Sequence, residues 1–373
     1  MSKNKIALYH CNSDKEISNK IRLIIEALGT KRFEELFKNK KVLLKPNMCI
    51  DHIPEKGATT YPTIMDALIT IVKEFGGEVI VGDAPAIGVK GNVFEKAGLY
   101  EVCKKHGVKL IDFNRDVGKV VVIENAIALK EVLIAKTYFE VDTIVNIPVF
   151  KSNSLYWISG ALKNMKGLIV GMDKHKPHYL GVPECVADLN GVLEQDFILM
   201  DGYIGMMGDG PTAGKPANAR LLIGGFDPVS IDSLAARLMG FPVEKIPMIK
   251  WAENAGIGNS DYEIIGDSLN SFHLKFDKPA IAKNRLKAAL INYGGKYFFR
   301  EAQNKSKMDI DENKCIMCGR CRDMCPFNAI SIEDKKITID QSKCDFCLCC
   351  TEVCKSEAIK LKGMLSRKDA FLR

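Results

Sequence analysis

The chain has 373 residues, of which 47% are hydrophobic and 27% charged, as is typical of a soluble globular protein with two domains. Its formal net charge is +7, but the basic residues form no stripe interleaved with aromatic side chains, which favours a solvated basic face over nucleic-acid binding. No apolar run is long enough to span a bilayer, and the first residues, MSKNKIALYHCNSDKE, contain no apolar signal core. We therefore expect no membrane insertion and no export, and a reducing, cytoplasmic compartment.

Strand-like and helix-like segments alternate over about the first 270 residues. Short β-branched or aliphatic runs predict strands at 5–11, 41–47, 78–85, 108–114, 142–150, 196–202 and 219–225. Helical periodicity predicts helices at 16–28, 61–77, 182–194 and 230–240. Strands that alternate with helices favour an α/β fold with a mainly parallel sheet.

The sequence changes character near residue 280. Residues 284–307 are basic and partly aromatic, and we expect a helical bridge there. After it, CIMCGRCRDMCPFNAISI (315–332) aligns with CDFCLCCTEVCKSEAIKL (344–361) at an offset of 29 residues. Two such repeats cannot bury a sufficient core, so bound metal must supply much of the folding energy. The expected organisation is an α/β domain, a basic helical linker, a small α+β ferredoxin-like domain and a tail, at 1–280, 281–308, 309–365 and 366–373.

Eight of the 13 cysteines fall in two runs with the spacing C-x2-C-x2-C-x3-C. At this spacing three thiolates wrap one [4Fe-4S] cluster, while the fourth reaches across to a second cluster. The expected ligand sets are Cys315, Cys318, Cys321 and Cys354 for the first cluster, and Cys344, Cys347, Cys350 and Cys325 for the second. A zinc site would use paired C-x2-C ligands, often with histidine, and no histidine follows His273.

Residues 309–364 resemble the bacterial ferredoxins that carry two [4Fe-4S] clusters, which implies one-electron transfer at low potential. The first run ends Cys325-Pro326, whereas the second ends Cys354-Lys355. We expect the Lys355 charge to raise the potential of the first cluster. Cys349 lies outside the spacing, and its simplest interpretation is an apolar filler; a spare ligand or a reactive thiol are the alternatives.

Polar residues follow several predicted strands of the α/β domain. They are Lys45, Asn47, Asp83, Lys151, Asn153 and Asp201. Ligands of open parallel sheets bind at the carboxyl ends of the strands, so these side chains are candidates for one site. The alternative is that they mark ordinary strand exits.

The segment 159–181 gathers cations among glycines. It contains Lys163, Lys166, Lys174, His175, Lys176 and His178. Close backbone approach and several cations suit a carboxylate or a phosphate, and a solvated basic helix is the alternative. The stretch GMMGDGPTAGKP (205–216) lacks the G-x4-G-K-[ST] spacing of a phosphate loop, so it predicts an ordered loop after a strand that ends at Asp201.

Residues 40–240 resemble the family known as domain of unknown function 362, which is often fused to ferredoxin modules. The matching stretches are LLKPN, TTYPTIMDALITIVKEFGGEVIVGDAP, SGALKNMKGLIVGMDKHKPHYLG, MDGYIGMMGDGPTAG and DPVSIDSLAARLMG. Where the family has Lys-Thr-His after the central strand, this chain has Lys151-Ser152-Asn153. A fainter likeness of layout to the N-terminal domain of lactate racemases implies small hydroxy-acid ligands.

The leading hypothesis is a redox protein whose ferredoxin module exchanges electrons with a small anionic substrate or cofactor in the α/β domain and with a redox partner protein. The expected ligand-binding residues are Lys45, Asn47, Lys151, Asn153, Lys163, Lys166 and Lys174. Asp83, His175 and His178 are the candidates for proton exchange. The alternative is a non-catalytic electron-transfer or cofactor-maturation protein whose α/β domain docks a protein partner.

Overall fold

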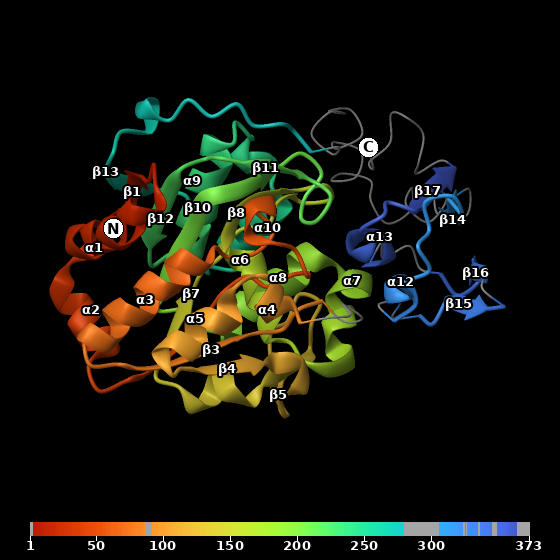
Figure 1. The fold of residues 1–373 in the computed structure, drawn as a ribbon, viewed down its shortest axis with the longest axis horizontal. Coiled ribbons are helices and arrows are strands. Elements are labelled where there is room, and N and C mark those ends of the chain that lie inside the picture. The colour runs from red at the N-terminus through yellow and green to blue at the C-terminus, as the bar shows by residue number, and fades with distance from the viewer. Residues whose placement is uncertain are drawn as a thin grey trace.

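We analysed a computed structural model of the chain (Figure 1), which describes residues 3–86, 92–279, 306–323, 325, 327–334, 336–344 and 349–363. Eleven described strands form one sheet. Its main path, from edge to edge, is β13 (Tyr262–Gly266), β1 (Asn4–His10), β12 (Leu221–Gly225), β10 (Phe197–Met207), β7 (Thr143–Asn146), β2 (Lys41–Lys45), β3 (Glu78–Asp83) and β4 (Lys109–Asp112). Only β12 runs against its neighbours on this path, so the prediction of a mainly parallel sheet is confirmed.

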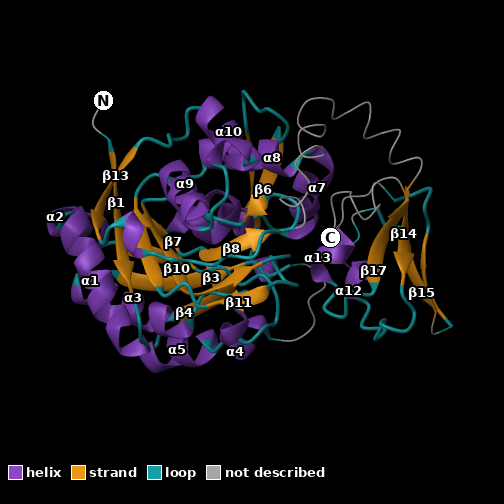
Figure 2. Cartoon of the chain, turned by 90° about the horizontal axis from the view of Figure 1, so that it is seen from above, coloured by secondary structure: helices purple, strands orange, loops and turns teal. Residues whose placement is uncertain are grey.

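Helices cover both faces of the sheet (Figure 2). One face carries α1 (Ile17–Leu28), α2 (Thr30–Phe37), α3 (Pro62–Glu74), α4 (Val93–Lys96) and α5 (Leu99–His106). The other carries α6 (Ala161–Asn164), α7 (Lys176–Leu180), α8 (Val182–Val192), α9 (Pro228–Leu238) and α10 (Pro247–Asn254). None of the described helices is long and apolar enough to cross a membrane.

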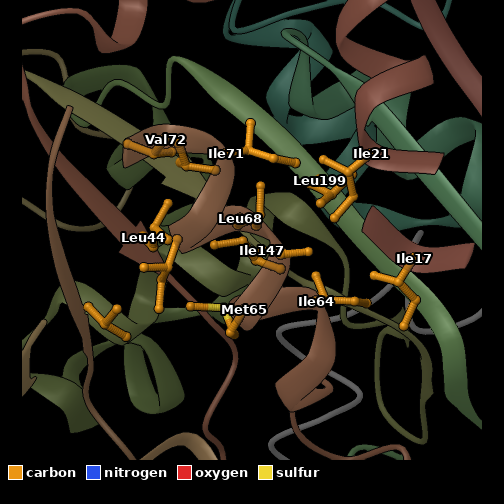
Figure 3. Close-up of a cluster of buried hydrophobic side chains, with 14 of the residues drawn as sticks. Ile17, Ile21, Leu44, Ile64, Met65, Leu68, Ile71, Val72, Ile147 and Leu199 are labelled. Atoms are coloured by element: carbon orange, nitrogen blue, oxygen red, sulfur yellow. The ribbon is translucent and has the colours of Figure 1, made fainter. Parts of the chain in front are cut away.

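Successive residues of the central strand β2 pack into hydrophobic clusters on opposite faces of the sheet. In β2, Val42 and Leu44 pack with α1 and α3, as Figure 3 shows for Leu44, whereas Leu43 belongs to a cluster on the other face. Side chains alternate across a strand, so a strand buried on both faces reads as a continuous apolar run. This explains why the runs from 41 and 78 predict strands well.

The predicted strand at 142–150 is divided in the structure. β7 ends at Asn146, and β8 (Val149–Asn153) follows after Pro148, which has no backbone N–H to donate to a ladder. β8 pairs with β10 and with the short β9 (Trp157–Ile158). This break turns the chain into the loops that form the candidate site.

The strand predicted to end at Asp201 is longer than expected. β10 continues to Met207 and pairs with β11 (Lys215–Ala217), so the glycine-rich stretch 205–216 is a β-hairpin. The sequence also did not predict a second hairpin, β5 (Gly118–Val122) with β6 (Glu131–Ala135). Asp201 is therefore inside a strand, where its carboxylate accepts the amides of Tyr61 and Tyr203 at 2.7 and 3.0 Å.

The C-terminal elements lie together at one end of the molecule (Figure 1). They are β14 (Ser306–Ile310), α12 (Arg320–Asp323), β15 (Ile330–Glu333), β16 (Lys336–Ile339), α13 (Cys349–Val353) and β17 (Ile359–Gly363). β14 pairs with β17 and β15 with β16, both antiparallel, so the described part is α+β. The predicted helical bridge and tail lie outside the described residues, except that residues 306–307 belong to β14.

Candidate anion cavity and cysteine module

A cavity of about 120 Å³ opens beside the carboxyl ends of β2 and β3. Its lining brings together six residues from the predicted strand exits and basic segment that carry a charge or a titratable ring: Asp83, Lys151, Lys163, Lys166, Lys174 and His178. The remaining lining residues are Asn47, Cys49, Ala84, Ala86, Ser159, Asn164, Gly167 and Pro211. Four lysines around so small a space make a strongly positive cavity.

Lys45 and Asp83 form a buried ion pair in the wall of this cavity. Lys45 Nζ donates to Asp83 Oδ1 at 2.8 Å, and Asp83 Oδ2 accepts the amide of Met48 at 2.7 Å. Burial lowers the pKa of Lys45, and the attraction of Asp83 opposes that shift. Asp83 balances the charge of Lys45, which is fully buried and is not among the lining residues.

Lys163 and Lys166 both line the cavity. Lys163 lies on α6, whose first amides, those of Ala161 and Leu162, donate to Asp232 at 2.6 and 3.1 Å. Asp232 therefore fixes the short helix that carries Lys163. The Lys163 amine lies 5.8 Å from the centre of the Tyr156 ring.

Lys166 contacts His178 across the cavity, with 3.0 Å between Nζ and Nε2. An ammonium group can only donate, so Nε2 of His178 accepts and the ring is neutral. Burial and the charges of Lys166 and Lys163 lower the pKa of His178 well below 6.5, in agreement with this geometry. His178 therefore leaves the positive charge at this position to Lys166.

Lys174 occupies another side of the cavity. Its amine donates to Ala84 O, Pro85 O and Asn114 Oδ1 at 2.8, 2.6 and 3.0 Å. Three acceptors suit the charged ammonium form, but burial lowers its pKa to about 7. The charge of Lys174 is thus sensitive to pH near neutrality.

A polar network holds Lys151 and the asparagines. Lys151 Nζ donates to Asn47 Oδ1 at 2.7 Å and to Ala58 O at 2.9 Å. Asn47 Nδ2 in turn donates to Asn164 Oδ1 at 2.7 Å. Asn164, Cys49 and Ser159 were not predicted; the only sequence signal is their position within or beside the two predicted segments.

Besides Lys45, two predicted site residues do not line the cavity. Asn153 is buried, accepts the amides of Leu155 and Tyr156 and donates to Ser159 Oγ, so its contacts hold the turn after β8. His175 is 2% exposed, and burial lowers its pKa. The structure places both residues near the site but not in its lining.

The cysteines of the C-terminal module surround a second, smaller cavity. Cys315, Cys318, Cys321 and Cys354 line a space of about 20 Å³, and these are the residues of the first predicted ligand set. Among the described residues no three His, Cys, Asp or Glu side chains are arranged to hold a single metal ion. A [4Fe-4S] cluster differs from a single metal ion because each of its four irons binds a separate thiolate. Four thiols spaced around a cavity therefore fit a cluster better than a single ion.

The described cysteines of the second set belong to the same apolar cluster. Cys350 is buried, and Cys325 and Cys344 pack against the cluster; Cys347 and the side chain of Cys349 lie outside what the structure describes. The amides of Ala329 and Ala358 donate to Cys325 Sγ and Cys354 Sγ at 3.3 and 3.2 Å. Such bonds stabilise thiolates, and they occupy equivalent positions in the two repeats.

The fold and the cysteine pattern define a class of protein, an α/β domain followed by an iron–sulfur domain. The chain belongs to the family described as "Domain of unknown function (DUF362)", whose model matches residues 42–237. The "4Fe-4S binding domain" model matches residues 308–331. This agrees with the resemblance seen in the sequence and supports an iron–sulfur electron-transfer role.

The chain is also similar to one protein of Synechocystis sp. and to one solved structure. It is 24% identical over 230 residues to "Thylakoid-associated protein sll1697" of Synechocystis sp., a match that covers 60% of this chain and 70% of that protein. The lactate racemase apoprotein of Thermoanaerobacterium thermosaccharolyticum aligns with a TM-score of 0.41 and 16% identity. That alignment covers 63% of this chain and 57% of the racemase, and it carries no argument about function.

Proposed function

We propose that the protein is an iron–sulfur redox protein in which the C-terminal module exchanges electrons with a small anion bound in the α/β cavity. The observation that carries the proposal is the charge of the cavity. Lys151, Lys163, Lys166 and Lys174 line it, whereas Asp83, its one carboxylate among the described lining residues, is paired with Lys45. Charge-assisted hydrogen bonds from such lysines suit a carboxylate or phosphate.

The volume of the cavity supports a small ligand. A cavity of about 150 Å³ is known to hold benzene, so 120 Å³ suits a ligand of about six non-hydrogen atoms or fewer. Phosphate, oxalate, pyruvate and lactate meet this limit, and citrate exceeds it. Lys163 and Lys166 are the expected donors to the anion, with Asn47, Lys151 and Lys174 as further polar contacts. His178 and Asp83 are the expected groups for proton exchange.

The residues of the module fit [4Fe-4S] clusters. Cys315, Cys318, Cys321 and Cys354 would hold the first, and Cys344, Cys347, Cys350 and Cys325 the second. When bound, these groups supply one-electron transfer. The protein's own contribution is to position the thiols, to donate the Ala329 and Ala358 amides to sulfur, and to keep the site apolar.

The test is thermal stabilisation by phosphate, oxalate, pyruvate, lactate and citrate. In the variant with Lys163→Met and Lys166→Met, binding of a responding anion should weaken by about 2–4 kcal/mol, because each lysine loses a charge-assisted hydrogen bond. Lys176→Met is the matched control, since Lys176 lies in the same segment, pairs with Asp173 and does not line the cavity. Equal responses of wild type and double variant to every anion would contradict the proposal.

A second candidate function, docking of a protein partner, is favoured by one surface feature. Val120 and Val122 alternate along β5 and are 58% and 67% exposed, so they lie on one face of the β5–β6 hairpin. Replacing both by aspartate should leave anion binding unchanged. Loss of electron exchange with a partner protein in that variant, without any anion binding in wild type, would favour docking.

A further inference from the structure

The loop that follows β2 contacts both candidate sites. At its beginning, Asn47 and Cys49 line the anion cavity. The Met48 amide donates to Asp83 Oδ2 at 2.7 Å, and Cys49 O accepts the Ala86 amide at 3.0 Å. These bonds fix the first half of the loop to the wall of the cavity.

Asp51, two residues after Cys49, binds the C-terminal module. Arg320 approaches its carboxylate with both terminal nitrogens, at 2.9 Å from Nη1 to Oδ1 and 3.1 Å from Nη2 to Oδ2. The Lys355 amine pairs with the same carboxylate and also donates to Asp51 O at 2.8 Å. Asp51 is 9% exposed, so this is a largely buried bidentate contact rather than a surface ion pair.

The two cations flank cysteines of one predicted ligand set. Arg320 directly precedes Cys321, and Lys355 directly follows Cys354. Both cysteines line the cavity of the module, although they come from different runs. Asp51 therefore joins the anion-cavity loop to the site formed by Cys315, Cys318, Cys321 and Cys354.

The repeat shows why only one half of the module can make this contact. The offset of 29 residues places Cys349 at the position of Arg320, and Pro326 at the position of Lys355. Neither residue carries a cationic side chain that could pair with a carboxylate. Arg320 and Lys355 thus contact Asp51 from positions at which the other repeat has no cation.

The charges at the contact also fit a loaded first site. Lys96 lies 3.6 Å from Asp51, so three cations surround one carboxylate. A [4Fe-4S]²⁺ core with four thiolates has a net charge of about −2, which would balance the surplus. The positive charge of Lys355, beside Cys354, is therefore partly balanced by Asp51 and acts on the cluster site less than an unpaired lysine would.

We propose that Asp51 is a positioning residue that fastens the Cys315–Cys318–Cys321–Cys354 site to the anion-cavity loop, so that this site, and not that of Cys344 and Cys350, is the redox centre beside the anion cavity. The role of this contact in electron exchange with an anion rests on the proposed function, but the contact itself does not depend on which anion binds. It places the first site on the side of the α/β domain.

The test is a redox titration of anaerobically purified protein, followed by EPR. Asp51→Asn keeps the size of the side chain and removes its charge, so the potential of one centre should rise, because loss of a nearby negative charge favours the reduced form. Cys318→Ser, which alters the EPR signal of the first site, identifies the centre that moves. Asp340→Asn is the matched control, since Asp340 precedes the second run and pairs with Lys343. It should leave the first centre unchanged.

Hydrogen exchange supplies a second readout. In Asp51→Ala the peptide covering residues 47–53 should exchange about tenfold faster, because charge-assisted bonds that hold the loop are lost. An unchanged potential of the first centre in Asp51→Asn, or a shift of the second centre instead, would overturn the inference. If the potential of the first centre rises in Asp51→Asn but no anion binds to wild type, the inference about Asp51 stands and the proposed function fails. If anions bind to wild type but the potential does not change, the proposed function stands and the inference about Asp51 fails.

Discussion

At the scale of single residues, Lys174 is a cavity cation whose charge depends on its surroundings. Burial lowers its pKa from 10.5 to about 7, while His178 titrates well below 6.5. The positive form of Lys174 exists below about pH 7 and is lost above it. Between about 7 and 10.5 the unfolded chain holds a proton that the folded chain has released, so this residue makes the fold more stable as pH rises there.

Anion binding should therefore weaken as pH rises from 6 to 8.5, by at most about tenfold per pH unit, because one positive charge leaves the cavity. Isothermal titration with the anion that stabilises wild type most measures this slope. Lys163→Met should keep the slope at lower affinity, and Lys174→Met should flatten it. A slope that persists in Lys174→Met would assign the pH dependence to another group.

Gly167 shows how tightly the buried ion pair is packed. A Cβ at this position would lie 2.1 Å from Asp83 Oδ1 and 2.6 Å from Lys45 Nζ. Gly167→Ala should therefore destabilise the protein by about 3 kcal/mol or more, because it displaces a buried ion pair. Gly191→Ala, in α8, meets no atom within 4 Å and should be neutral or stabilising by up to about 1 kcal/mol. Chemical denaturation compares the two variants, and similar stabilities would contradict the packing argument.

At the scale of elements, the two cysteine repeats depend on each other. Cys354 follows α13 of the second repeat but lines the cavity of the first set. Cys354→Ala should therefore damage the first cluster and leave Cys344, Cys347 and Cys350 ligated. Cys349→Ala should keep both clusters, because all eight positions of the pattern remain occupied. Iron analysis and EPR measure both effects, and loss of a cluster in Cys349→Ala would show that the ligand assignment is wrong.

At the scale of the whole molecule, the two complete cysteine runs predict two clusters, and the matched 4Fe-4S model covers residues 308–331. We expect about eight iron and eight acid-labile sulfide per chain, with a broad visible band that dithionite bleaches. Metal and sulfide analysis of anaerobically purified protein checks this. About four iron per chain would mean that the protein holds one cluster instead of two. Stoichiometric zinc without sulfide would exclude the electron-transfer proposal.

The features that depend on the spacing of residues along the chain could be predicted from the sequence alone. The alternation of apolar runs and periodic segments predicts the mainly parallel sheet, and the cysteine spacing predicts that Cys354 joins Cys315, Cys318 and Cys321 around one space. The alternation of side chains along a strand and the wrapping of one cluster by cysteines at i, i+3 and i+6 are short-range geometry, whereas the place of Cys354 was predicted from the repetition of the pattern in the second run. The sequence also located the basic segment, but it did not show that Lys166 contacts His178 or that Lys174 donates to Ala84 O, Pro85 O and Asn114 Oδ1.

Only the tertiary structure decided which of the predicted polar residues share a space and which already have partners. Lys45 and Lys151 were both predicted at strand exits, yet Asp83 balances the charge of Lys45, while Lys151 lies within β8 and lines the cavity. Asp51 gave no signal in the sequence, because its partners Arg320 and Lys355 are 269 and 304 residues away. Contacts at such separations depend on how the sheet, its loops and the C-terminal module pack together, and no local pattern records that packing.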